Sequence, residues 1–106
     1  MSEAKRNATV TALREGELLR LRRGALWLDV RYPSEYQYDR LPGAINVPLA
    51  EVRNMFAVLD RSSEYIAYCQ SGRRSAAAAF LFAQRGFKVC LLEGGLWAAG
   101  RGRKVA

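Results

Sequence analysis

Short apolar runs alternate along this chain with segments in which apolar side chains recur every three or four positions. Runs of the first kind are typical of buried strands, and the second pattern is typical of amphipathic helices. One predicted strand begins at Val10, and four others cover residues 26–30, 44–47, 65–68 and 89–92. The predicted helices cover residues 12–21, 51–59 and 73–85, with a last short helix over 96–99. Strands that alternate with helices indicate an α/β domain with a parallel sheet, whose ligands bind beyond the carboxyl ends of the strands.

Boundary residues support several of these elements. The helix over 73–85 has the strongest support, because Ala76 to Ala79 combine high helix propensity with small side chains that allow close packing on a sheet. Gly86 is its predicted end. Ser34 is a predicted N-cap for a short helical turn, and the sequence Leu-Pro-Gly at 41–43 predicts a tight turn.

The composition predicts one globular domain, since the chain has 106 residues and half of them are hydrophobic. We expect residues 1–8 to be a flexible polar segment and residues 9–106 to form the domain. No apolar run is long enough to cross a bilayer, and the N-terminal charges are not followed by the apolar segment of a signal peptide. The expected location is therefore the cytoplasm, with no membrane partner.

Two residue types limit the available chemistry. The chain contains no histidine, which excludes histidine-based acid–base catalysis and most transition-metal sites. Its two cysteines, Cys69 and Cys90, are too few for a structural zinc site, and a disulfide framework is not expected in a domain with this much core. No metal or other cofactor is expected.

The net charge of +7 favours small anions or an acidic protein as partners. The basic residues fall into small scattered clusters, and no stripe of alternating basic and aromatic residues occurs. Nucleic acid is therefore not an expected partner.

The run Cys69-Gln70-Ser71-Gly72-Arg73-Arg74-Ser75 lies between a predicted strand and the helix over 73–85. A helix N-terminus and neighbouring cations stabilise a thiolate, and this loop supplies both. Backbone N–H groups of residues 70–74 can form an anion nest, with Gly72 in a conformation that a side chain would obstruct. Ser71 and Ser75 can donate hydrogen bonds to the sulfur or to a bound oxyanion. The loop thus predicts a reactive cysteine beside an anion site.

Four stretches of the chain resemble the rhodanese-like sulfurtransferases, over about Val10 to Val105. They are residues 28–36, residues 41–49, the six-residue loop 69–74 with its cysteine, four residues and arginine, and residues 92–97. The resemblance implies a single rhodanese-like domain, in which helices flank a parallel five-stranded sheet on both faces. One departure is Arg40, at a position where the family often has histidine.

The resemblance also implies a reaction. Cys69 would take the outer sulfur of thiosulfate or a similar anionic donor, become a persulfide, and pass the sulfur to cyanide in an assay or to a thiol in the cell. The N–H groups of residues 70–74 would hold the persulfide, and Arg73 and Arg74 would hold the donor anion. This relay needs no general base, which agrees with a chain that lacks histidine.

This interpretation has two alternatives. Cysteine phosphatases and arsenate reductases also use a thiolate in a cradle, but phosphatase loops have five residues between cysteine and arginine, and here there are four. A non-catalytic binding or regulatory module of the same fold is the other alternative, although such relatives commonly lack the cysteine or the loop arginine.

Several residues near the loop have structural interpretations. Asp29, at a strand end, is expected to bond loop backbone or pair with an arginine rather than act in catalysis. Arg31 and Glu35 are expected to form an ion pair four residues apart, with Arg31 at the pocket rim. Cys90 lies mid-strand and is expected to be a buried, inert thiol. Trp27 and Trp97 are expected in the core or at the rim of the site.

Overall fold

The computed structural model describes residues 10–13 and 24–98 of the chain. The strands in these ranges are β1 (Thr11–Leu13), β2 (Leu26–Asp29), β3 (Ile45–Asn46), β4 (Glu64–Tyr68) and β5 (Lys88–Leu92). The helical segments are α2 (Pro33–Tyr38), the 3₁₀ helix η2 (Leu49–Met55), α3 (Arg73–Gln84) and α4 (Gly95–Ala98). Strands and helices alternate, which confirms the predicted α/β class.

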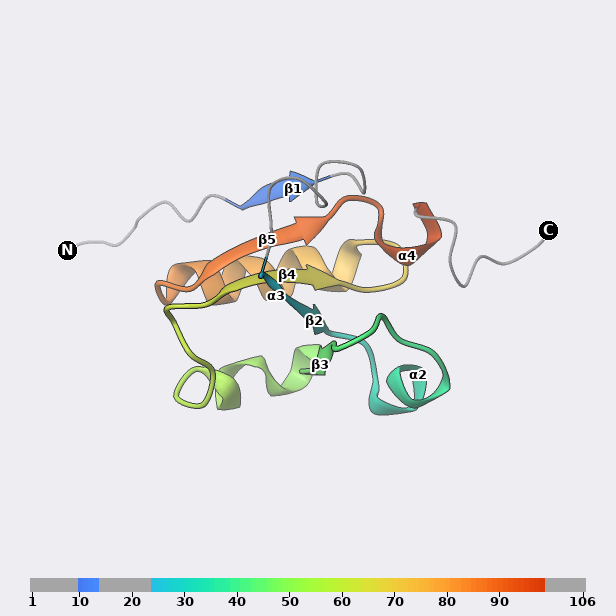
Figure 1. Ribbon diagram of the computed structural model, residues 1–106, viewed down its shortest axis with the longest axis horizontal. Helices are drawn as coiled ribbons and strands as arrows, with labels where there is room; N and C mark the ends of the chain where they lie inside the picture. Colours follow the sequence, from blue (N-terminus) through green and yellow to red (C-terminus); the bar gives the residue numbers. More distant parts are fainter. Residues whose placement is uncertain (1–9, 14–23, 99–106) are drawn as a thin grey trace.

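The strands form one parallel sheet in the order β1-β5-β4-β2-β3. All arrows in Figure 1 point the same way, and α2 and α4 lie beyond their tips. The chain leaves β2 toward β3 and leaves β4 in the opposite direction toward β5, so the strand order reverses between β2 and β4. Open parallel sheets bind their ligands at such a reversal, beyond the carboxyl ends of the strands. The sheet therefore places a candidate site after Asp29 and Tyr68.

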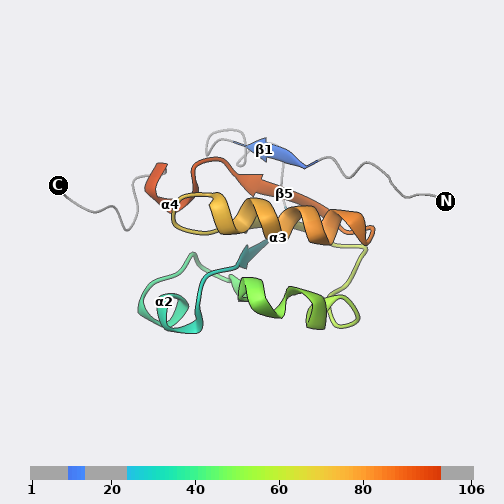
Figure 2. The ribbon, with the colours of Figure 1, turned by 180° about the vertical axis from the view of Figure 1, so that it is seen from behind.

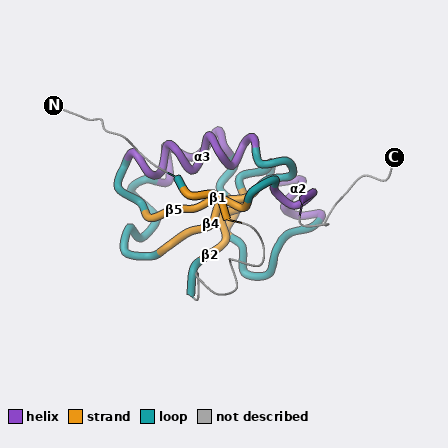
Figure 3. Tube along the Cα trace, turned by 90° about the horizontal axis from the view of Figure 1, so that it is seen from above, coloured by secondary structure: helices purple, strands orange, loops and turns teal. Residues whose placement is uncertain are grey.

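One face of the sheet is covered by α3 and η2. Figure 2 shows α3 in front of β4 and β5, and Figure 3 shows it as a layer above the strands. Its buried residues Ala78, Ala79 and Phe82 pack on side chains from alternate strand positions. The Phe82 ring meets those of Phe56 and Phe87 edge-on, with ring centroids 5.5 and 5.1 Å apart. This aromatic group closes the core at the end of the sheet away from the site.

The opposite face carries a second apolar cluster. Side chains in a strand point alternately to the two faces, and in β4 this sends Ile66 and Tyr68 into the second cluster while Tyr65 and Ala67 join the first. Tyr36 from α2 and Leu96 from α4 pack with this second cluster. Helices therefore contribute side chains to both cores.

The structure corrects three details of the predicted elements. Ala12 and Leu13 belong to β1 and not to a helix, and the rest of the helix predicted over 12–21 lies outside the described residues. The segment after Pro48 is a 3₁₀ helix that begins at Leu49, because its hydrogen bonds join residues three apart, such as Glu51 N–H to Pro48 O at 2.7 Å.

The third correction is that Ser34 does not cap α2. The N-cap of α2 is Tyr32, since Pro33 already occupies the first helical turn. The turn predicted at 41–43 is present, with Ala44 N–H donating to Leu41 O at 3.1 Å. Among residues 10–13 and 24–98, no helix has the length and apolar character needed to span a membrane.

Candidate active site

Cys69 follows β4 directly and lies at the base of the loop that leads into α3. Its side chain is 1% exposed. The sulfur accepts hydrogen bonds from the backbone N–H groups of Gly72, at 3.1 Å, and Ser75, at 3.3 Å. The thiol faces the Ser75 hydroxyl at 3.5 Å, and that hydroxyl donates to Gly72 O at 3.1 Å. Amide donors that converge on one sulfur stabilise negative charge there.

The carbonyl groups of Cys69 and Gln70 accept hydrogen bonds from the backbone of α4. Leu96 N–H donates to Cys69 O at 2.9 Å, and Trp97 N–H donates to Gln70 O at 3.0 Å. Gly95 makes this close approach possible, because a Cβ there would lie 2.5 Å from both carbonyl oxygens. The φ of Gly95, +68°, also favours glycine. With these two carbonyls held by α4, the N–H groups of Gly72 and Ser75 remain directed at the sulfur.

Gly72 is the second glycine on which the loop depends. Its φ of +99° is one that residues with side chains rarely adopt, and it immediately precedes α3. This conformation turns the Gly72 N–H toward the sulfur of Cys69. The predicted special role of Gly72 therefore has a structural basis.

Arg74 is bound by a carboxylate from another element. Its guanidinium donates to both oxygens of Glu35 on α2, at 2.7 and 3.2 Å, and lies over the Tyr32 ring. The hydrogen bond to Glu35, and then the charges of Glu35 and Cys69, raise the pKa of Arg74 above its ordinary value although partial burial opposes the change. The same bond lowers the pKa of Glu35. The pair ties the start of α3 to α2.

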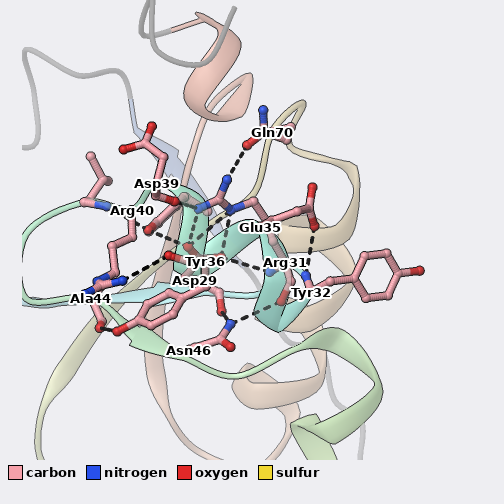
Figure 4. A network of polar contacts seen from close by, with 12 residues as sticks. Asp29, Arg31, Tyr32, Glu35, Tyr36, Asp39, Arg40, Ala44, Asn46 and Gln70 are labelled. Atoms are coloured by element: carbon pink, nitrogen blue, oxygen red, sulfur yellow. Dashed lines mark hydrogen bonds and ion pairs between the residues drawn. The ribbon is translucent and has the colours of Figure 1, made fainter.

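The other predicted loop residues differ in exposure. Arg73 and Ser71 are exposed, and within the described part of the chain the Sγ atom of Cys69 has hydrogen bonds with Gly72 and Ser75 but not with Ser71. Gln70 is partly buried, and its side-chain oxygen accepts a hydrogen bond from the Arg31 guanidinium, as Figure 4 shows.

A buried polar network lies beside the loop (Figure 4). Arg31 is 4% exposed and donates to both oxygens of Asp29, which is fully buried. The same guanidinium donates to Gln70 Oε1 at 2.6 Å and to the carbonyl of Asp39. Burial opposes the charge of Arg31, but its hydrogen bond and attraction to Asp29 raise the pKa. The network thus fixes Gln70, the residue next to the nucleophile candidate.

Tyr68 joins this network to the second core. Its hydroxyl donates to Asp29 Oδ2 at 2.7 Å and accepts from Leu41 N–H at 3.1 Å. Burial is the main cause that raises the pKa of Tyr68, which keeps the hydroxyl protonated as a donor. The prediction that Asp29 pairs with an arginine and loop backbone is confirmed, since Asp29 also accepts from Arg31 N–H at 3.0 Å.

The predicted ion pair between Arg31 and Glu35 is wrong. The prediction relied on both residues lying four apart on one helix, but α2 begins at Pro33, so Arg31 precedes it and pairs with Asp29. Glu35 instead accepts from Tyr32 N–H at 2.9 Å and binds Arg74. Arg40, the position that departs from the family pattern, lies over the Tyr36 ring and donates to Tyr36 O at 3.1 Å.

The second cysteine lies apart from the loop. Cys90 is buried in the cluster on one face of the sheet and Cys69 belongs to the cluster on the other face. Burial of Cys90 agrees with its prediction. In residues 10–13 and 24–98, no three His, Cys, Asp or Glu residues are grouped so that they could hold a metal ion.

Sequence reasoning missed two parts of the site. It did not assign Glu35 to the loop arginine, because nothing local links residues on α2 and α3. It also gave Gly95 no role, although the pair Gly94-Gly95 after a buried strand was a signal for close backbone approach.

Comparisons with known proteins agree on one family. A family model described as Rhodanese-like domain matches residues 14–99. The thiosulfate sulfurtransferase PspE of Escherichia coli is 39% identical over 72 residues, which cover 66% of this chain and 69% of that protein. The crystal structure of a rhodanese-related protein from Thermoplasma volcanium matches with a TM-score of 0.78 at 30% identity, covering 91% of this chain and 97% of that one. An Escherichia coli structure titled rhodanese with anions matches with a TM-score of 0.57 at 40% identity, over 68% and 88% of the two chains.

Proposed function

Since this chain belongs to the rhodanese-like domain family, we propose that it is a thiosulfate sulfurtransferase that carries sulfur on Cys69. The observation that carries the proposal is the sulfur of Cys69, held by the N–H groups of Gly72 and Ser75 at a helix start. The likeness to PspE, which is named a thiosulfate sulfurtransferase, supports thiosulfate as the donor.

The proposed reaction has two displacements at sulfur. The Cys69 thiolate attacks the outer sulfur of thiosulfate, a new sulfur–sulfur bond forms, and sulfite leaves with the electron pair of the bond that breaks. Cyanide or an acceptor thiolate then attacks the outer sulfur of the persulfide, and Cys69 leaves as a thiolate. Neither step transfers a proton to carbon or nitrogen, so no histidine is required.

The loop favours each stage of this reaction. Amide donors aimed at Sγ stabilise the thiolate and then the terminal sulfur of the persulfide. Arg73 and Arg74 add positive charge for the donor anion, and the net charge of +7 draws anions toward the protein. The expected partners are therefore a small anionic sulfur donor and a thiol or cyanide acceptor; an acidic protein is a further proposed partner.

Thiocyanate formation from thiosulfate and cyanide tests this function. We expect parallel-line kinetics of a double-displacement mechanism, complete loss of activity in Cys69→Ser, and activity close to wild type in the matched variant Cys90→Ser. Both variants should keep the circular dichroism spectrum of the wild type. If no donor yields a persulfide on the wild-type protein, the domain is instead a binding or regulatory module of this fold.

A further inference from the structure

A cavity of about 300 Å³ lies where α2 meets the reactive loop. The residues that line it are Arg31, Ser34, Glu35, Tyr38, Asp39 and Gln70. Gln70 is bonded to Cys69 along the chain, so their Cα atoms are about 3.8 Å apart. On another side, Glu35 binds Arg74, whose raised pKa is due in part to the charge of Cys69. Two walls of the cavity are therefore connected directly to the surroundings of the reacting sulfur.

The side-chain amide of Gln70 has one fixed orientation. Its Oε1 atom accepts a hydrogen bond from the Arg31 guanidinium at 2.6 Å. A guanidinium has donors but no acceptor, so the atom that faces it must be the amide oxygen. The amide nitrogen lies on the side away from Arg31 (Figure 4), and within the described residues it has no hydrogen-bond partner. Gln70 thus has two N–H donors available to a ligand in the cavity.

This donor is held before any ligand arrives. The Gln70 carbonyl accepts from Trp97 N–H at 3.0 Å, so the backbone and the side chain of Gln70 are both anchored. The anchor of the side chain is itself buried, since Arg31 is 4% exposed and binds both oxygens of Asp29. A group that is already ordered loses little conformational entropy when a ligand binds to it.

Two of the charged side chains on the cavity wall are already paired. Arg31 binds Asp29, and Glu35 binds Arg74. Among the groups still available within the described residues are uncharged ones, namely the Gln70 N–H donors and the exposed Ser34 hydroxyl. Such groups recognise a carbonyl oxygen, as in an amide, and they do not require a charged ligand.

We propose that this cavity binds the head group of the sulfur acceptor, and that the acceptor is a small thiol whose amide carbonyl accepts from the Gln70 side chain. A volume near the lower end of ligand pockets, which span about 300–1,000 Å³, favours a small molecule. The inference rests on the proposed sulfurtransferase function. In the step concerned, the thiol loses its proton to solvent and its thiolate attacks the outer sulfur of the Cys69 persulfide. The acceptor becomes a persulfide, and Cys69 keeps the electron pair of the bond that breaks.

Two acceptors test recognition of the amide. N-acetylcysteamine and 2-mercaptoethanol are both small uncharged thiols, but only the first carries an amide. The quantity to measure is the ratio of kcat/KM for N-acetylcysteamine to kcat/KM for 2-mercaptoethanol, with thiosulfate as the donor. Any general effect of a substitution on the reactivity of Cys69 acts on both thiols and cancels in this ratio.

Gln70→Glu keeps the shape of the side chain and an oxygen for Arg31, but it replaces the N–H donors by a second oxygen. We expect it to lower the ratio by roughly 2- to 12-fold, the range of one uncharged hydrogen bond, and Gln70→Met to lower it similarly. Gln84→Glu is the matched control, because Gln84 is exposed at the end of α3, and it should keep the wild-type ratio. An unchanged ratio in Gln70→Glu and Gln70→Met, or an equal fall in Gln84→Glu, would overturn the proposal.

A binding measurement separates this inference from the proposed function. Wild-type protein is titrated with the methyl thioether of N-acetylcysteamine, which cannot accept sulfur, and the side-chain amide resonances of Gln70 and Gln84 are followed by NMR. We expect the Gln70 resonances to shift and those of Gln84 to stay in place. If Gln70 responds but thiosulfate leaves no sulfur on Cys69, only the proposed function fails. If Gln70 does not respond, or responds no more than Gln84, the inference fails whatever the activity.

Discussion

Gly95→Ala tests the contact between α4 and the reactive loop most severely. A methyl group at this position would lie 2.5 Å from the carbonyl oxygens of Cys69 and Gln70, closer than packed atoms allow. The backbone φ of +68° adds strain of roughly 1–2 kcal/mol for a residue with a side chain. Relief of the clash requires α4 to move away from the loop, which breaks the bonds from Leu96 N–H and Trp97 N–H to those carbonyls.

The cost can be estimated from these parts. Each of the two lost backbone hydrogen bonds contributes roughly 0.5–1.5 kcal/mol, so strain and lost bonds together should lower the free energy of unfolding by about 2–5 kcal/mol. The loop carbonyls would then rotate, and the N–H groups of Gly72 and Ser75 would turn away from the sulfur. We therefore expect loss of persulfide formation together with faster alkylation of Cys69, which is 1% exposed in the wild type.

Gly43→Ala is the matched control. Gly43 has a similar φ of +77°, but a Cβ there has nothing within 4 Å, so this variant carries the strain without the clash. Urea denaturation gives the free energy of unfolding of both variants, and iodoacetamide in a Cys90→Ser background gives the reactivity of Cys69. The reasoning is refuted if Gly95→Ala is no less stable than Gly43→Ala and keeps the wild-type alkylation rate.

Two further predictions concern the polar contacts around the loop. Tyr68→Phe leaves the buried N–H of Leu41 without its acceptor and removes a donor to Asp29, so the free energy of unfolding should fall by about 1–3 kcal/mol in urea denaturation; an unchanged midpoint would show that these bonds contribute nothing. Glu35→Gln should destabilise the protein only at pH values where Glu35 is ionised. The hydrogen bond to Arg74 lowers the pKa of Glu35 below its usual 4.5. The ion pair therefore contributes its full stability above pH 4.5, and this contribution is lost as the pH falls through the lower pKa of the folded state. The difference in unfolding free energy between wild type and Glu35→Gln should shrink between about pH 6 and about pH 3, and a constant difference would contradict the ion pair.

Local sequence patterns predicted the sheet and the position of Cys69. The strand at 65–68 and the helix that starts at Arg73 are encoded by apolar runs and alanine-rich helical sequence, and they place the cysteine at a strand-to-helix turn. Asp29 could likewise be assigned to a strand end. These features depend on neighbours in the sequence, so the sequence alone reveals them.

Contacts between site residues that lie far apart in the sequence could not be predicted from local patterns. Glu35 meets Arg74 only because β2 and β4 are adjacent and bring α2 beside the start of α3. The four-residue spacing favoured Arg31 as the partner of Glu35. However, α2 begins after Arg31, and the buried Arg31 guanidinium pairs with Asp29. Contacts that depend on strand order, such as Gly95 against the loop, appear only in the folded structure.

The most direct test of the central claim is the sulfite released from thiosulfate when no acceptor is present. If Cys69 carries the sulfur, wild-type protein should release about one equivalent of sulfite per chain in a single burst, with the mass of one sulfur atom gained by the intact protein. Cys69→Ser should release none, and Cys90→Ser should behave like wild type. Sulfite release without a sulfur adduct, or a full burst from Cys69→Ser, would contradict the account.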